Sequence, residues 1–170
     1  MQNPDSILPG FQPPAADKQV PPRSEWGDIL FAATAEVFSM MVGSTVVRAD
    51  RATPPAGANV TGTVGIAGAL RASFTLRCAK GTATRIASQM LGVPAEEAST
   101  QDCDAVGEIC NMVAGHFKAK IGLEAECMLS VPLVILGSDY HLHSVNEGER
   151  LEVPVLYNCE LLDIVLEIRK

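Results

Sequence analysis

Four residues in the segment 102–120 recur at spacings that could present chemical groups to an approaching molecule. Asp104, Glu108, Asn111 and Gly115 follow one another at intervals of four, three and four residues. A helix has about 3.6 residues per turn, so it would place two carboxylates, a carboxamide and a glycine in one stripe. A solvated surface is the plainest interpretation of such a stripe. Two features weigh against it: glycine costs about 1 kcal/mol relative to alanine in a helix, and asparagine is unfavourable in mid-helix.

A second candidate is the pair His141 and His143, which would share one face of a β-strand. Two imidazoles on one face are compatible with a metal ion, and metal binding through them is one hypothesis for the protein. No third ligand follows at a clear spacing, so solvated surface histidines are the plainer interpretation. We therefore expect no metal site.

The five cysteines are odd in number and widely spread, and no Cys-x-x-Cys occurs. This pattern predicts small, buried, reduced side chains. The residues are Cys78, Cys103, Cys110, Cys127 and Cys159.

The polar stripe needs a helix whose opposite face is apolar, and the sequence supplies one. Apolar residues at helical spacing predict a helix over 102–120, with Ser99 or Thr100 as its N-cap. Its buried face should consist of Val106, Ile109, Cys110, Val113, Phe117 and Ile121.

Two further helices are predicted upstream. Apolar spacing indicates one over 26–42, capped by Ser24 and ended by Gly43, and another over 80–91, ended by Gly92. Alternating or apolar runs predict strands elsewhere, with 60–66 and 70–78 joined as a tight hairpin, a loop at 53–57, and a break at Pro132. The other strands are expected at 44–48, 127–136, 140–145, 151–157 and 161–168.

The segments 36–43 and 108–115 resemble each other, sharing Glu, Met and Gly at equivalent positions. Strands follow each segment, which indicates a duplicated unit of one helix and three strands. The expected fold is α+β: two such repeats share a mostly antiparallel sheet of about six strands, with long helices packed on it. In the first copy Glu36 is retained, but Ser39 replaces the asparagine.

Composition indicates the kind of core and the number of domains. The 170 residues are 47% hydrophobic with few aromatics, which indicates one core built from aliphatic side chains. Residues 1–24 hold six of the 11 prolines and predict a flexible arm before a single domain at 25–170.

Charge and hydropathy exclude several classes of partner. The arm is charge-neutral, so the domain carries the whole net charge of -7, which disfavours nucleic acid. No apolar run approaches the ~18 residues of a membrane-spanning helix. The first residues also lack a basic, apolar leader. We therefore expect a cytoplasmic protein without membrane contact.

The motif Asp104-x-x-x-Glu108-x-x-Asn111, with Gly115 and the downstream Pro132, resembles the signature of the CheC/CheX family of chemotaxis response-regulator phosphatases. The similarity extends more loosely over residues 25–168. One intact motif on the second of two repeats resembles the single-site CheX branch more than the two-site CheC branch.

The resemblance implies hydrolysis of the aspartyl phosphate on a CheY-like receiver domain. In such phosphatases an asparagine orients the attacking water and a glutamate grips the active-site lysine of the receiver. Carried over, Asn111 and Glu108 are the catalytic pair, Asp104 is a supporting contact, Gly115 allows close approach, and Pro132 belongs to the docking region. The divalent metal is expected on the receiver, and no cofactor on this chain.

The resemblance also implies a homodimer paired through its sheet, since CheX proteins pair in this way. The first copy, with Glu36 and Ser39, is expected to be degenerate, because a serine hydroxyl is shorter than a carboxamide. An alternative stays open: the same fold could dock a receiver, or act as a dimeric interaction module, without catalysis.

Overall fold

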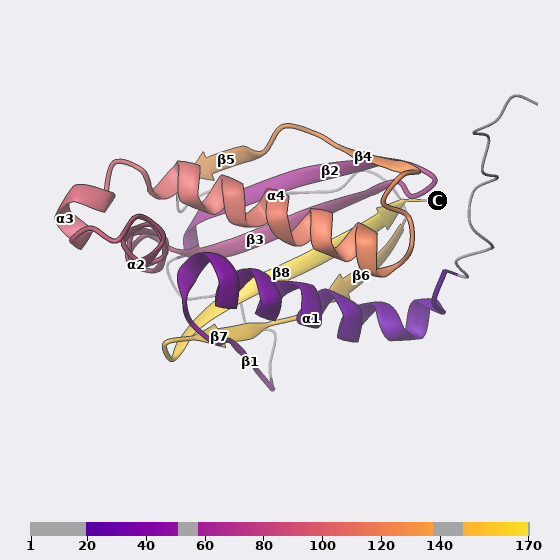
Figure 1. The fold of residues 1–170 in the computed structure, drawn as a ribbon, viewed down its shortest axis with the longest axis horizontal. Helices are drawn as coiled ribbons and strands as arrows, with labels where there is room; N and C mark the ends of the chain where they lie inside the picture. The colour runs from indigo at the N-terminus through magenta and orange to yellow at the C-terminus, as the bar shows by residue number, and fades with distance from the viewer. Residues whose placement is uncertain (1–19, 51–57, 138–147, 170) are drawn as a thin grey trace, which may run out of the picture.

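The structure is a computed structural model that describes residues 20–50, 58–137 and 148–169. The loop expected at 53–57, the strand expected at 140–145 with His141 and His143, and most of the arm lie outside the described residues. Two long helices, α1 (Trp26–Val37) and α4 (Asp102–Lys120), lie side by side across one face of a single sheet (Figure 1). None of the helices in the described ranges is long and apolar enough to cross a membrane.

The sheet has six strand positions, two of which are interrupted. Its order is β1-β7-β8-β3-β2-β4, with β5 following β4 along β2 and β6 preceding β7 along β8. All pairings are antiparallel, which confirms the predicted fold class. The strands are β1 (Val47–Arg48), β2 (Ala58–Gly68), β3 (Ala72–Ala79), β4 (Cys127–Leu129), β5 (Leu133–Leu136), β6 (Gly148–Glu152), β7 (Val155–Tyr157) and β8 (Glu160–Arg169).

The breaks in the sheet have a common cause. Pro132 separates β4 from β5, as predicted, and Pro154 lies between β6 and β7, where one continuous strand was expected. Proline has no N–H to give to a ladder, so both prolines interrupt the pairing. The strand expected at 44–48 is shorter and consists of Val47 and Arg48 alone.

The two repeats exchange their outer strands. Strand β3 of the first repeat pairs with β8 of the second at the centre of the sheet. Outside this centre, β1 of the first repeat pairs with β7 of the second, while β4 and β5 of the second pair with β2 of the first. The duplicated halves therefore share one sheet and one core, as the sequence repeat predicted.

The first helix has the expected bounds but not the expected cap. A 3-10 turn (Arg23–Glu25) precedes α1, and no side chain caps its N-terminus, so the prediction of Ser24 as cap was wrong. After Val37 the helix widens into a π-helical turn, η2 (Phe38–Val42). It ends at Gly43, whose φ of 67° lies in the left-handed region that glycine adopts at low cost.

The helices between the repeats follow the prediction with two differences. Helix α2 (Lys80–Leu91) ends at Gly92 as expected. A short helix α3 (Ala95–Ala98) forms between α2 and α4, where no element was predicted. Gln101 precedes α4 without a side-chain cap, because the Ser99 hydroxyl donates instead to the carbonyl of Glu96 at 2.8 Å. The predicted Ser99 or Thr100 cap was therefore wrong.

The core is mainly aliphatic and lies between the helices and the sheet. All six residues predicted for the buried face of α4 are fully buried. Rings connect the elements: Trp26 of α1 packs edge-on against Phe117 of α4, with centroids 5.6 Å apart.

The cysteine prediction was only partly right. Cys78, Cys110 and Cys127 are buried, Cys103 is partly exposed and Cys159 is exposed. Cys159 lies in the two-residue turn between β7 and β8, where Asn158 and Cys159 both have positive φ. A turn this tight directs its side chains away from the core.

Candidate functional site

Helix α4 presents the predicted polar stripe on the face opposite its core contacts. Val113 and Phe117 are fully buried. Asp104 and Glu108 are exposed, and Asn111 is partly exposed. The predicted orientation of the helix is therefore confirmed, and its carboxylates and amide can reach a molecule that approaches from solvent.

A glycine on the strand beneath α4 allows the helix to lie close to the sheet. A Cβ on Gly62 of β2 would be 2.6 Å from the Cys110 Sγ and 2.9 Å from the Val106 Cγ1. Real Cβ atoms do not approach so closely. Gly62 thus sets the depth of the turns that carry Glu108 and Asn111.

Pro132 lies against α4 at another glycine, Gly107. A Cβ on Gly107 of α4 would be 3.4 Å from the Pro132 Cβ and 3.6 Å from the Val134 Cγ2. Beside this contact is a groove of about 420 Å³, which we call the α4–β5 groove. It is lined by Cys103, Asp104, Gly107, Glu108, Pro132 and Val134.

The groove brings together only part of the predicted set. Asp104, Glu108 and Pro132 line it, whereas Asn111 lies farther along α4. Gly115 lines a different hollow of about 480 Å³ with Glu36 and His116. A Cβ on Gly115 would meet only the Leu129 Cδ1 at 3.9 Å, so packing within the described residues does not require glycine there.

Three lining residues were missed by the sequence analysis: Cys103, Gly107 and Val134. Gly107 carried a usable signal, because it is a glycine inside a helix next to Glu108, and the propensity argument made for Gly115 applies to it equally. Nothing local marked Val134, which reaches the groove only through the pairing of β5 with β2.

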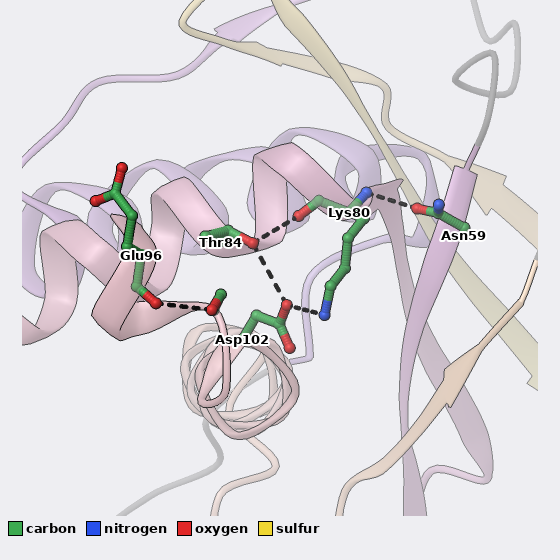
Figure 2. Close-up of polar contacts among 6 residues, drawn as sticks. Asn59, Lys80, Thr84, Glu96 and Asp102 are labelled. Atoms are coloured by element: carbon green, nitrogen blue, oxygen red, sulfur yellow. Dashed lines mark hydrogen bonds and ion pairs between the residues drawn. The ribbon is translucent and has the colours of Figure 1, made fainter. Parts of the chain in front are cut away.

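The start of α4 is fixed by a polar network at the first turn of α2 (Figure 2). The Lys80 Nζ forms an ion pair with the carboxylate of Asp102, whose side chain is only 3% exposed. The Thr84 hydroxyl lies 3.4 Å from the same carboxylate, and the backbone N–H of Lys80 donates to the Asn59 Oδ1 at 2.6 Å. Strand β2 and helices α2 and α4 are thereby joined next to the groove.

The glutamate of the first repeat, Glu36, contacts two basic side chains of α4. The Glu36 carboxylate accepts a 2.7 Å hydrogen bond from the Lys120 Nζ and lies 3.5 Å from the His116 Nδ1. These contacts, with that of Lys120 the strongest, lower the pKa of Glu36 below its ordinary value. Ser39 is exposed.

The two glutamates of the repeat therefore differ in surroundings. Neither Asp104 nor Glu108 forms an ion pair with any residue in the described part of the chain, whereas Glu36 forms two contacts with bases. Within the same residues, no group of three or more His, Cys, Asp or Glu side chains is arranged to hold a metal ion.

The corresponding helix face of the first repeat is covered by an arginine. By the alignment of 36–43 with 108–115, Phe31 stands where α4 has Cys103. The Arg48 guanidinium lies over the Phe31 ring at 4.8 Å and binds the Asp28 Oδ1 at 2.7 Å and the Gly27 carbonyl at 3.0 Å. Among the residues that the structure describes, the second repeat thus combines an open groove with an unpaired glutamate, and the first does not.

Known proteins resemble this chain in sequence and in fold. The family model described as chemotaxis phosphatase CheX matches residues 60–156. The chain belongs to the CheX family. CheX from Vibrio vulnificus is 26% identical, with 88% of this chain and 99% of that chain covered and a TM-score of 0.70. No curated protein matched the chain.

Two further CheX structures share the fold. CheX from Desulfovibrio desulfuricans is 24% identical over 85% of this chain and 99% of that chain, with a TM-score of 0.71. A structure from Borrelia burgdorferi is a CheX–CheY complex with BeF3 and Mg; it is 19% identical, covers 89% of this chain and 100% of that chain, and has a TM-score of 0.69.

Proposed function

We propose that this CheX protein hydrolyses the aspartyl phosphate of a CheY-like receiver domain in chemotaxis or a related two-component system. The observation that carries the proposal is the outward placement of Glu108 and Asn111 on α4, with the Glu108 carboxylate unpaired among the described residues. The family of the chain supports the same activity. The CheX–CheY complex from Borrelia supports a receiver as the partner.

The chemistry needs little from this chain beyond positioning. Phosphoryl transfer to water depends on an in-line nucleophile and on neutralised charge. In the proposal the Asn111 carboxamide orients the water, because it can accept from and donate to it. Glu108 binds the active-site lysine of the receiver, Asp104 supports docking, and Gly115 lets the receiver approach α4. The receiver supplies the divalent metal.

The first repeat does not contribute a second site in this proposal. Glu36 contacts Lys120 and His116. Arg48 covers α1 at Phe31, upstream of Glu36. The Ser39 hydroxyl is too short to replace a carboxamide. The asymmetry supports one active site per chain.

Dephosphorylation of purified receivers tests the activity. Receivers charged with acetyl phosphate are mixed with wild-type protein, Asn111→Ala or the matched control Ser39→Ala, and phosphate release is followed. We expect wild type and Ser39→Ala to accelerate release equally, and Asn111→Ala to lose about 100-fold. No acceleration by wild type of any phospho-receiver, with the protein in excess, would refute the proposal. Binding without acceleration would identify a docking module instead.

We also propose a homodimer formed at the β4–β5 edge of the sheet. This edge and the link between its strands carry four exposed apolar side chains: Met128 (76% exposed), Val131 (85%), Leu133 (58%) and Leu136 (55%). Exposed apolar edges favour association with another strand. Light scattering should give a dimer mass for wild type and for Met40→Lys, which alters an exposed methionine elsewhere, and a monomer mass for Leu133→Lys. A monomeric wild type would refute the dimer.

A further inference from the structure

The α4–β5 groove combines an apolar wall with two acidic side chains. Its base is formed by Gly107, which has no side chain, and its apolar wall by Pro132 and Val134. Asp104 and Glu108 stand at its rim, one helical turn apart. Side chains four residues apart on a helix have Cβ atoms about 6 Å apart. The two carboxylates can therefore bind two separate cations.

The first repeat holds a long basic side chain against the neighbouring part of its own helix. There, Arg48 crosses from the edge strand β1 to α1, lies over Phe31 and ends on the Asp28 carboxylate. In the second repeat Asp104 stands where the first repeat has Ala32, so the groove has an acid of its own. No ion pair joins Asp104 or Glu108 to a cation of the described residues. The groove thus matches a long basic side chain that the chain itself does not provide.

We propose that the α4–β5 groove receives a second basic side chain of the docked receiver, an arginine or lysine outside the active site of that receiver. This inference rests on the proposed function. It adds a contact that would determine which receiver the protein binds. The methylene stem lies against Pro132 and Val134, and the cationic head binds Asp104. Glu108 stays available for the active-site lysine. Receivers share their active site, so a contact beside it is where they can be discriminated.

A kinetic comparison tests the contact, using a receiver that wild type dephosphorylates. A docking contact that does not touch the reacting atoms should change KM and leave kcat unchanged. We expect Asp104→Asn to raise KM about three- to tenfold and to weaken its salt dependence. The control Glu97→Gln, an exposed acid on α3, should change neither. An unchanged KM for Asp104→Asn, or a loss confined to kcat, would overturn the proposal.

A second variant supplies the groove with a cation of its own chain. Val134→Arg places a guanidinium at the wall of the groove and should raise KM more than Val134→Met, which keeps the wall apolar. Equal values for the two variants would contradict occupation of the groove by a cation. If light scattering shows that Val134→Arg dissociates a dimer while KM is unchanged, the groove is covered by a second copy of the chain and the proposal is wrong.

Binding of a small arginine derivative, measured without any receiver, tests the groove independently of the proposed phosphatase activity. Nα-acetyl-arginine amide, titrated into ¹⁵N-labelled full-length protein, should shift the Gly107 and Val134 amide signals saturably in wild type but not in Asp104→Asn. Nα-acetyl-leucine amide should have no such effect. Absence of saturable shifts overturns the groove as a site for basic side chains. Binding of the arginine amide, together with failure to dephosphorylate any receiver, would keep the basic preference and reject the receiver as its source.

Discussion

Lys120 and Glu36 form a 2.7 Å ion pair that joins the last residue of α4 to α1. The glutamate that the repeat would assign to partner binding thus stabilises the contact between the two long helices. Two residues of one type, Glu36 and Glu108, differ in surroundings, because among the described residues only Glu36 contacts bases on the neighbouring helix.

Replacing Glu36 should affect stability in a pH-dependent way. The pKa of Glu36 is lowered in the folded protein, chiefly by Lys120, so its stabilising effect is present above the ordinary pKa of a glutamate. That effect is lost as the pH falls through the lower, folded-state pKa. We expect Glu36→Gln to cost less than about 1 kcal/mol at pH 7, because the pair is half exposed. Urea unfolding at pH 7 and pH 3 measures this, and an equal cost at both pH values would contradict it.

Asn111→Ala and Gly115→Ala should each raise stability while impairing the proposed activity. Alanine is the better helix former by about 0.5 kcal/mol at the first position and up to about 1 kcal/mol at the second. A Cβ at Gly115 finds only an ordinary contact. The control Gly81→Ala, with nothing within 4 Å, should stabilise α2 and leave phosphatase activity unchanged. Thermal melting and phosphate release measure both effects; a lower melting temperature for Gly115→Ala would show that its space is needed within the fold.

Gly62→Ala should destabilise the protein by about 1–3 kcal/mol. The new methyl group would overlap the Cys110 Sγ and the Val106 Cγ1, and an overpacked core responds by moving backbone or side chains. Gly62→Ala combined with Cys110→Ala should recover part of the loss, because one of the two overlapping atoms is gone. Urea midpoints of the two variants give the comparison, and identical stability of Gly62→Ala and wild type would mean that α4 can shift freely.

Loss of Lys80 should be more harmful alone than together with loss of its partner. Lys80→Met leaves the buried Asp102 carboxylate without its cation, which we expect to cost about 1–3 kcal/mol. Asp102→Asn in the same chain removes the uncompensated charge and should restore part of the stability. A double-mutant cycle by urea denaturation measures the coupling, and additive effects would indicate that the two side chains do not interact.

The five thiols should react with a disulfide reagent in a defined order. Cys159 is exposed in its turn and should react first in the native protein. Burial raises the pKa of Cys78 to about 12 and raises that of Cys110 as well, so both remain protonated and inaccessible until unfolding. Mass spectrometry after timed labelling at pH 8 gives the order, and early modification of Cys78 would contradict the burial.

Local sequence patterns predicted much of the fold. The apolar stripe through Val106 and Phe117 fixed which side of α4 faces the sheet, and hence that Glu108 and Asn111 face outward. Gly43 and Gly92 marked two helix ends correctly, because each adopts a backbone conformation that other residues avoid. The helix starts were also predicted correctly, but their caps were not: no side chain caps α1 or α4, and the Ser99 hydroxyl donates to the Glu96 carbonyl.

The shared sheet and the groove required contacts between distant segments. The repeat in the sequence indicated two halves with one sheet, but not that β1 and β4–β5 would each cross to the other half. That exchange brings Pro132 and Val134 beside Gly107 and opens the groove, while Lys120 reaches Glu36 across the helix pair. Periodicity reports which face of an element is buried, and it carries no information on which distant element covers that face. The sequence by itself therefore determined the residues that face outward, and the packing of its two halves decided which of them are open to a partner.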